Sequence, residues 1–167
     1  LTYQKTGDFE QALHYFLMSL TIIEEQATEL LELKAGLFLN ISVIHYRCKN
    51  YEDSLIHIGQ AFNIFTMLGF KNGIFQCYIS FGNVFILLKE VAKAFEYYSK
   101  ALEIAKALDD RHQMSVIYNN LAVVSEQEGD FELALDFVHK SLKIKRELDN
   151  KHSIVVGYAR LSFIYSS

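Results

Sequence analysis

The sequence contains no proline and only 8 glycines in 167 residues. Chains built from strands and tight turns place both residues at their bends, so this scarcity favours an all-α fold. Cysteine is also rare: Cys48 and Cys77 are too few for a disulfide framework and show no metal-ligand spacing. Two unpaired thiols fit a reducing compartment, which predicts a cytoplasmic protein.

An excess of basic charge is missing as well, since 16 Lys and Arg stand against 20 Asp and Glu, a net charge of −4. This balance argues against nucleic acid as a partner. The longest apolar run, residues 74–88, contains Gln76, Ser80, Gly82 and Asn83 and is shorter than the ~20 residues of a membrane span. The chain opens without the features of a signal peptide, so we expect no membrane partner.

The charge is unevenly distributed along the chain. Residues 1–34 carry six acidic and two basic side chains, whereas residues 138–167 carry six basic and two acidic ones. Two interpretations stay open: solvated helix faces, or electrostatic steering of a partner or a second copy.

An internal repeat is the strongest feature that the sequence does contain. The segment Gly7-Asp8-Phe9-Glu10 returns as Gly129-Asp130-Phe131-Glu132, and residues 7–22 share nine of sixteen positions with residues 129–144. Two weaker copies begin near Tyr51 and Val91. One small residue marks all four copies, at intervals of 42, 40 and 40: Ala12, Ser54, Ala94 and Ala134. A period of this length is typical of helical repeat proteins.

A second element precedes each of the last three copies. It has a large, a large and a small residue at i, i+3 and i+4, which is one face of a helix. The small residues in this element are Ser42, Gly82, Ala122 and Ser162. Each repeat is therefore predicted to be an A helix, a short turn and a B helix, with the small residues at the helix contacts.

Helix ends follow from the same pattern. We expect A helices to end near Tyr46, Leu87 and Gln127, and B helices to end near Leu68, Leu108 and Leu148. The first B helix is expected to be longer, from about Phe9 to Leu31, after a partial A helix that includes Leu1.

The predicted fold is thus an all-α solenoid of antiparallel helix pairs in a single array, residues 1–167. Its expected parts are a partial repeat 1 (about 1–33), repeat 2 (34–72), repeat 3 (73–111), repeat 4 (112–150) and the A helix of a truncated repeat 5 (151–167). Such ends suggest a fragment of a longer array. The last A helix would lack a B partner and expose Ile154, Val155, Leu161, Phe163 and Ile164, so we expect self-association through exposed terminal helices.

These residues carry a family resemblance: the chain resembles tetratricopeptide (TPR) repeats. The family pattern is met most fully by Tyr118, Leu121, Ala122, Gly129-Asp130-Phe131, Ala134 and Ser141. The resemblance implies a right-handed superhelix that binds a protein or peptide in a groove lined by A helices. The spacing of about forty residues is similar to arrays in bacterial sensor proteins, in peptide-pheromone receptors and in animal polarity adaptors of the Pins/LGN kind.

The expected groove residues lie just beside the core stripe of each A helix. They are Asn40, Val43, Arg47, Ser80, Asn83, Asn119, Asn120, Val123, Gln127 and Arg160. By resemblance, Asn40 and Asn120 occupy a position where TPR proteins often bind ligand backbone, and Ser80 and Arg160 replace that Asn in other repeats. The alternative is that these Asn side chains bond neighbouring loops or water.

Motifs of catalysis are missing from the sequence. It has no phosphate loop, no Gly-x-Ser-x-Gly and no calcium loop. Of the six His, His45 occupies a core aromatic position by resemblance, and the others are expected on the surface or in links. We therefore expect a non-enzymatic protein without cofactor or metal. It would be the sensory or scaffold segment of a larger signalling protein, with two alternatives: a peptide-pheromone-type regulator, or a structural adaptor that multimerises through its ends.

Overall fold

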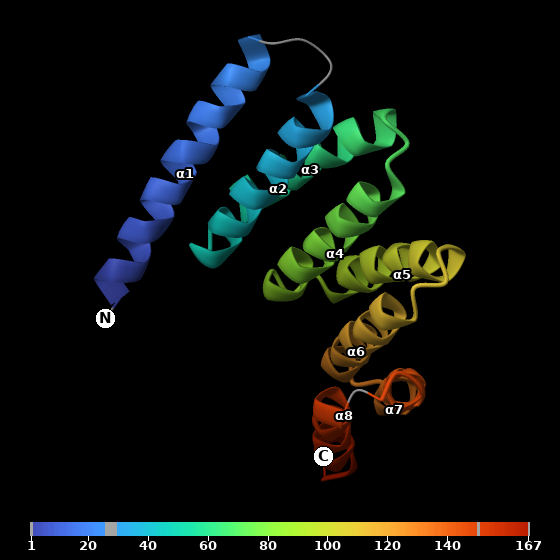
Figure 1. Cartoon of the computed structure of the whole chain (residues 1–167). Helices are drawn as coiled ribbons and strands as arrows, with labels where there is room; N and C mark the ends of the chain where they lie inside the picture. Colours follow the sequence, from blue (N-terminus) through green and yellow to red (C-terminus); the bar gives the residue numbers. More distant parts are fainter. Residues whose placement is uncertain (1, 26–29, 150, 167) are drawn as a thin grey trace. The chain divides into compact units, whose positions relative to one another are not determined.

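The computed structural model describes residues 2–25, 30–149 and 151–166, and the side chains of residues 9–20, 30–149, 154–162, 164 and 165. All regular structure in these ranges is helical (Figure 1). The helices are α1 (Thr2–Glu25), α2 (Leu31–Arg47), α3 (Tyr51–Met67), α4 (Lys71–Leu87), α5 (Val91–Ala107), α6 (Arg111–Glu128), α7 (Phe131–Glu147) and α8 (Lys151–Ser166). The predicted all-α fold of antiparallel helix pairs is confirmed, and the expected ends of α2 to α7 agree with the structure to within one residue.

The chain divides into two compact units, an N-terminal unit (Leu1–Val84) and a C-terminal unit (Phe85–Ser167). In the N-terminal unit α2 packs against α1 and against α3. The α3–α4 contact is aromatic, because the Phe62 ring lies 5.4 Å from that of Tyr78 and 6.3 Å from that of Phe81.

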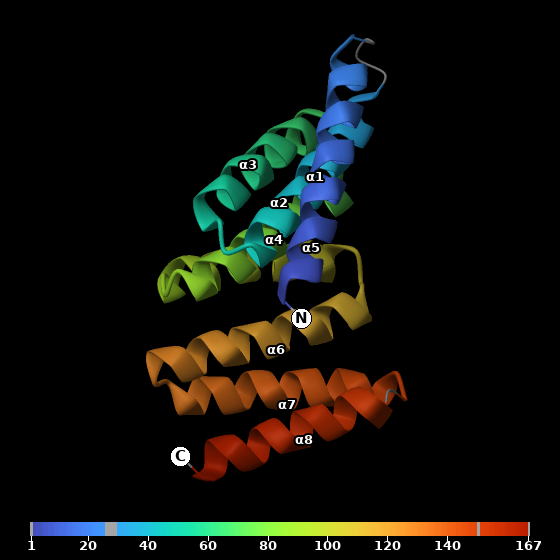
Figure 2. The ribbon, with the colours of Figure 1, turned by 90° about the vertical axis from the view of Figure 1, so that its left-hand side faces the viewer.

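In the C-terminal unit each helix packs on the next, and α6, α7 and α8 lie in a row (Figure 2). The Phe95 ring of α5 lies 6.2 Å from the Phe137 ring of α7. The predicted repeat boundaries stay predictions.

Small residues lie at the helix contacts, as the repeat pattern predicts. Ser54, Ala94, Ala122 and Ala134 are fully buried, and Ser42 is nearly so. The Ser54 Oγ donates a hydrogen bond of 2.9 Å to the Ser42 carbonyl, which links α2 to α3. Ser162 is wrongly predicted as a contact residue, because it is exposed on α8.

Each helix from α2 to α7 ends in one turn geometry. A residue with positive φ follows each of them, 20 positions after the one before: Lys49, Gly69, Lys89, Asp109, Gly129 and Asp149. The amide of the next residue reaches back to a helix carbonyl in most of these turns, for example Asn50 N to His45 O at 2.8 Å. Asp110 and Asp130 then cap α6 and α7 by accepting a hydrogen bond from the amide three residues on.

The first repeat departs from the prediction. Helix α1 runs from Thr2 through Gly7-Asp8 without a turn and ends at Glu25, whereas the sequence predicted an A helix, a turn, and a B helix extending to Leu31. Gly and Asp lower the helix propensity of this stretch, but propensity alone does not end a helix. Leu31 begins α2 instead, and residues 26–29 lie outside the described residues.

Helix α8 is also less exposed than predicted. Leu161 and Ile164 are buried in the α7–α8 pair, and Gly157 lies directly beneath the Leu142 side chain. Val155 is 68% exposed, whereas Phe163 lies outside the described side chains. The predicted self-association stays a prediction.

Candidate functional site

A cleft of about 160 Å³ opens between helices α2, α3 and α4 of the N-terminal unit. Four of the predicted groove residues line it together: Val43, Arg47, Ser80 and Asn83. The other lining residues are Ser42, Tyr46, Ser54, Ile58 and Val84. The cleft therefore brings together residues 33 to 40 positions apart that the repeat pattern assigns to one surface.

Helical periodicity explains this arrangement. Positions 42, 43, 46 and 47 form one face of α2, and positions 80, 83 and 84 form one face of α4. Ser42 and Ser54 are both buried, so the side chains beneath the cleft are small and the α2 and α3 backbones approach closely.

The walls of the cleft offer three kinds of contact. Val43 is 43% exposed and supplies apolar surface, and Arg47 supplies an exposed cation. Ser80 and Asn83 are half-buried and contribute a hydroxyl and a carboxamide. An amide both donates and accepts, so this set can pair with peptide groups while the aliphatic surface is desolvated.

The remaining predicted groove residues lie elsewhere. Asn40 is exposed on α2, nearly one turn before Val43, and does not line the cleft. Asn119, Asn120 and Val123 are half-buried on α6, and Gln127 is exposed near its end.

Arg160 of α8 is held by an ion pair inside the C-terminal unit. Its Nη1 donates to the Glu126 Oε1 of α6 at 3.1 Å, and the Glu126 side chain is only 16% exposed. Glu126 lies eighty positions, or two predicted repeats, after Tyr46, and Arg160 lies eighty positions after Ser80. Tyr46 and Ser80 line the cleft of the N-terminal unit. Glu126 is not among the predicted groove residues, although an acidic residue at the position equivalent to Tyr46 was the available signal.

A positively charged neighbour adds to this region. Lys145 of α7 is buried, and burial together with the nearby Arg160 guanidinium lowers its pKa. Lys145 of α7 and Arg160 of α8 thus bring two like charges close together beside the Arg160–Glu126 ion pair.

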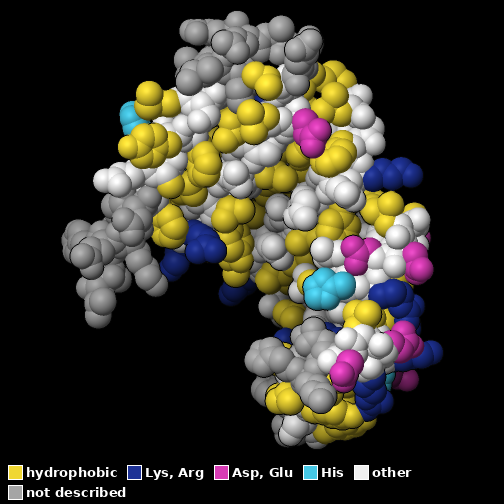
Figure 3. Space-filling view, viewed as in Figure 1, with side chains coloured by type: hydrophobic (Ala, Val, Ile, Leu, Met, Phe, Trp, Pro, Cys, Tyr) yellow, Lys and Arg dark blue, Asp and Glu magenta, His cyan; other side chains and the backbone are white. Residues whose placement is uncertain are grey.

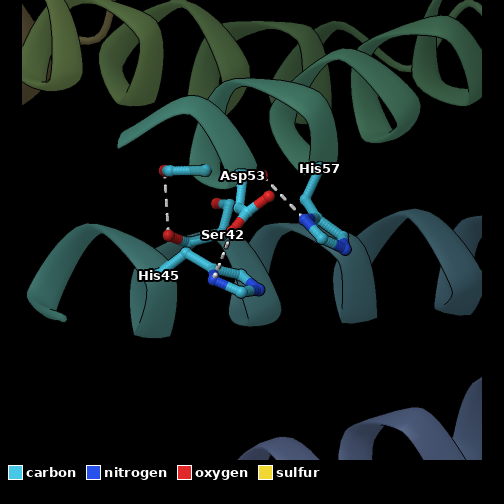
Figure 4. Close-up of polar contacts among 5 residues, drawn as sticks. Ser42, His45, Asp53 and His57 are labelled. Atoms are coloured by element: carbon cyan, nitrogen blue, oxygen red, sulfur yellow. Dashed lines mark hydrogen bonds and ion pairs between the residues drawn. The ribbon is translucent and has the colours of Figure 1, made fainter. Parts of the chain in front are cut away.

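Two histidines meet between α2 and α3 (Figure 4). The His45 and His57 rings stack with centroids 5.0 Å apart, and the Asp53 carboxylate lies 3.7 Å from His45 Nδ1. Burial and the neighbouring His57 lower the pKa of His45. His57, predicted on the surface or in a link, is half-buried on α3, where its ring stacks on His45. In the described part of the chain no three His, Cys, Asp or Glu side chains are grouped to hold a metal ion.

The two units differ in surface character. On the face drawn in Figure 3 the surface over α1–α4 is mainly apolar or uncharged, and charges of both signs gather over α5–α8. Among the described residues, no helix combines the length and the apolar character that a membrane crossing requires.

Comparison with known proteins agrees with the helical-repeat fold. The sequence pattern of the tetratricopeptide repeat family matches residues 33–107 and 78–147. No curated protein matches the sequence.

Solved structures share the fold. BtubC (BKLC) from P. vanneervenii superposes with a TM-score of 0.89 at 21% identity, over 98% of this chain and 67% of that one. A Rap protein complexed with competence and sporulation factor superposes with a TM-score of 0.76 at 22% identity, over 96% of this chain and 44% of that one. A third structure is the Signal Transduction ATPase with Numerous Domains protein PH0952 from Pyrococcus horikoshii, which has a tetratricopeptide repeat sensor. It superposes with a TM-score of 0.83 at 16% identity, over 98% of this chain and 25% of that one. The chain thus spans less than half of two of these proteins.

Proposed function

We propose a function from the premise that this chain belongs to the tetratricopeptide repeat family: it is a non-enzymatic module that binds an extended segment of a partner protein or peptide in the α2–α4 cleft. The observation that carries this proposal is the meeting of Val43, Arg47, Ser80 and Asn83 in one cleft. The repeat pattern predicts all four as residues beside the core stripe, in the groove that the tetratricopeptide resemblance implies.

The cleft chemistry indicates which contacts the partner makes. Arg47 is exposed at the end of α2 and pairs with a carboxylate of the partner. Ser80 and Asn83 bond its peptide groups, and Val43 packs on an apolar side chain. The partner segment is therefore extended, apolar at one position and acidic at or near another.

The larger context is the sensory or scaffold segment of a signalling protein. The likeness in fold to a signal transduction ATPase with a tetratricopeptide repeat sensor supports this. The alternative, a regulator that responds to a short peptide, draws support from the likeness to a Rap protein complexed with competence and sporulation factor. The forty-residue repeat variant is supported by helices that begin at Leu31, Lys71, Arg111 and Lys151.

The experiment selects binders from a phage-displayed library of random twelve-residue peptides and measures the affinity of the best peptide by fluorescence polarisation. Val43→Asp should weaken binding at least tenfold, because it replaces apolar contact area with a charge that must be desolvated. Arg47→Gln should weaken binding about tenfold by removing a charged hydrogen bond.

The matched control is Ile56→Asp, which changes an exposed aliphatic side chain on α3 outside the cleft. It should leave the affinity unchanged, and circular dichroism should show all three variants folded. A selected peptide that binds Val43→Asp and Arg47→Gln as tightly as the wild type would refute the cleft as the binding site.

A further inference from the structure

A pair of stacked rings recurs in the two units. His45 and His57 stack at 5.0 Å with 14° between their planes, and Phe85 and Tyr97 stack at 5.4 Å with 10°. The two pairs lie forty positions apart, and each joins the end of one helix to the next helix. Forty positions after Phe85 and Tyr97 lie Ser125 and Phe137, so the position equivalent to His45 and Phe85 has no ring.

Phe137 keeps its other ring contacts. Its ring stacks on Tyr118 at 6.0 Å, as the His57 ring lies 6.1 Å from Phe38 eighty positions earlier, and it lies 6.2 Å from Phe95. The ring position at Ser125 is left without aromatic atoms.

A cleft of about 460 Å³ lies at this place, lined by Ala92, Phe95, Ser125, Glu128, Asp130 and Leu133. The cleft at the corresponding place in the N-terminal unit, which His45 lines, measures about 230 Å³. Loss of the ring at Ser125 contributes to the larger space, because a Ser side chain fills less volume than an imidazole or a phenyl group.

The cleft has an unsatisfied polar group and an acidic rim. Ser125 is 2% exposed, and among the described residues its Oγ has no hydrogen-bond partner. A buried hydroxyl without a partner is unfavourable, so a ligand group that bonds it gains stability. Glu128 and Asp130 are exposed on the rim, and residues 126–132 contain four carboxylates and no basic side chain.

Two of these carboxylates already have partners within the protein. Asp130 already accepts the Leu133 amide at 3.0 Å, and Glu126 is paired with Arg160. Glu128 is therefore the carboxylate that we assign to a ligand, with Asp130 adding to the negative potential.

We propose that this cleft binds an arginine side chain of a partner protein, with the guanidinium beside Ser125, where the ring is missing. A guanidinium is planar and cationic, so it stacks on the Phe95 ring and pairs in bidentate fashion with the Glu128 carboxylate. One of its remaining N–H groups bonds the Ser125 Oγ, and its methylene stem packs against Leu133. The site belongs to the C-terminal unit and is independent of the α2–α4 cleft.

The test uses three acetylated and amidated pentapeptides, Gly-Ala-X-Ala-Gly, with arginine, lysine or citrulline at X. Each is titrated into the ¹⁵N-labelled protein while the amide signals of Ser125, Glu128 and Leu133 are followed by NMR. The arginine peptide should shift these signals with a Kd on the order of 1 mM. The lysine peptide should bind at least fivefold more weakly, and citrulline, which keeps the shape without the charge, should not bind.

Variants separate the site from general attraction to acidic surface. Ser125→Phe, which supplies the ring found at Phe85, should abolish the shifts, and Glu128→Gln should weaken binding about tenfold. Glu132→Gln removes a nearby exposed carboxylate outside the cleft and should change nothing. Equal binding of the arginine and lysine peptides, or undiminished binding by Glu128→Gln, would overturn the proposal, and so would the absence of shifts at these amides. Because Glu128 is a surface residue, its variant tests the proposal even if Ser125→Phe fails to fold.

Discussion

Replacing Gly73 by Ala should destabilise the α3–α4 contact, although Ala is the better helix former. A Cβ at Gly73 would lie 2.3 Å from Phe65 Cγ and 2.4 Å from Cδ1. Carbon atoms pack best at about 3.5 Å, so the ring would have to retreat by roughly 1 Å. Phe65 is 3% exposed and packs against the Phe70 ring at 5.5 Å, which leaves it little room to move. Overpacking of this kind costs about 1–3 kcal/mol.

Gly36 provides the matched control, because a Cβ there meets nothing within 4 Å. Gly36→Ala should stabilise by about 1 kcal/mol through helix propensity alone. Comparing the two Gly→Ala changes largely cancels that propensity gain, so Gly73→Ala should be about 1–3 kcal/mol less stable than Gly36→Ala.

The assay is thermal unfolding followed by circular dichroism at 222 nm. Since 1 kcal/mol corresponds to about 2–4 °C in Tm for a chain of this size, Gly36→Ala should raise the Tm by about 2–4 °C. Gly73→Ala should melt at least about 2 °C below Gly36→Ala. Adding Phe65→Leu to Gly73→Ala should cost less than Phe65→Leu costs alone, because the ring that clashes is gone. An equal rise in Tm for both Gly→Ala variants would refute the close contact on which this reasoning rests.

Two further predictions concern titratable groups. Burial and His57 lower the pKa of His45 against the opposing influence of Asp53, and Glu10 of α1 faces the same cleft. The unfolded chain therefore binds the His45 proton more tightly, so this contribution to stability is present above the ordinary histidine pKa near 6.5 and declines as the pH falls towards the lowered value. His45→Phe should flatten the fall in the urea midpoint between pH 7.5 and 5, and an unchanged slope would contradict this account. Burial raises the pKa of Cys77 to about 12, whereas Cys48 is exposed. A disulfide reagent at pH 8 should therefore modify one thiol rapidly and the second only on unfolding; two rapid reactions would show that α4 opens readily.

Helix boundaries and small-residue contacts could be predicted from the sequence because both depend on local patterns that occur in several copies of the repeat. Ser54 and Ala134 had to be small wherever two helices cross, and the Gly129-Asp130 turn had to end one helix and cap the next. The residues of the α2–α4 cleft could be predicted from the same periodicity, because Val43 and Asn83 lie next to predicted core positions of their helices.

Features that depend on the partner side chain could not be predicted in this way. Gly7-Asp8 has the same local sequence as Gly129-Asp130, yet only the second pair forms a turn, whereas the first lies inside α1. The Arg160–Glu126 pair and the His45–His57 stack each join residues on different helices. A single sequence shows which residues lie on one face of a helix, but it does not show which of them contact each other across two helices.

The left-handed residues every 20 positions from Lys49 to Asp149 have a consequence for how such a chain changes over time. Because the connections that follow α2 to α7 share this positive-φ residue, a helix pair can be duplicated, deleted or exchanged with another without redesigning these connections. Four of the six joints use Lys or Asp instead of Gly, so surface charge can vary at the corners while the backbone path is preserved. Length and ligand preference can thus evolve separately, the first by copying whole helix pairs and the second by changing a few side chains beside each stripe.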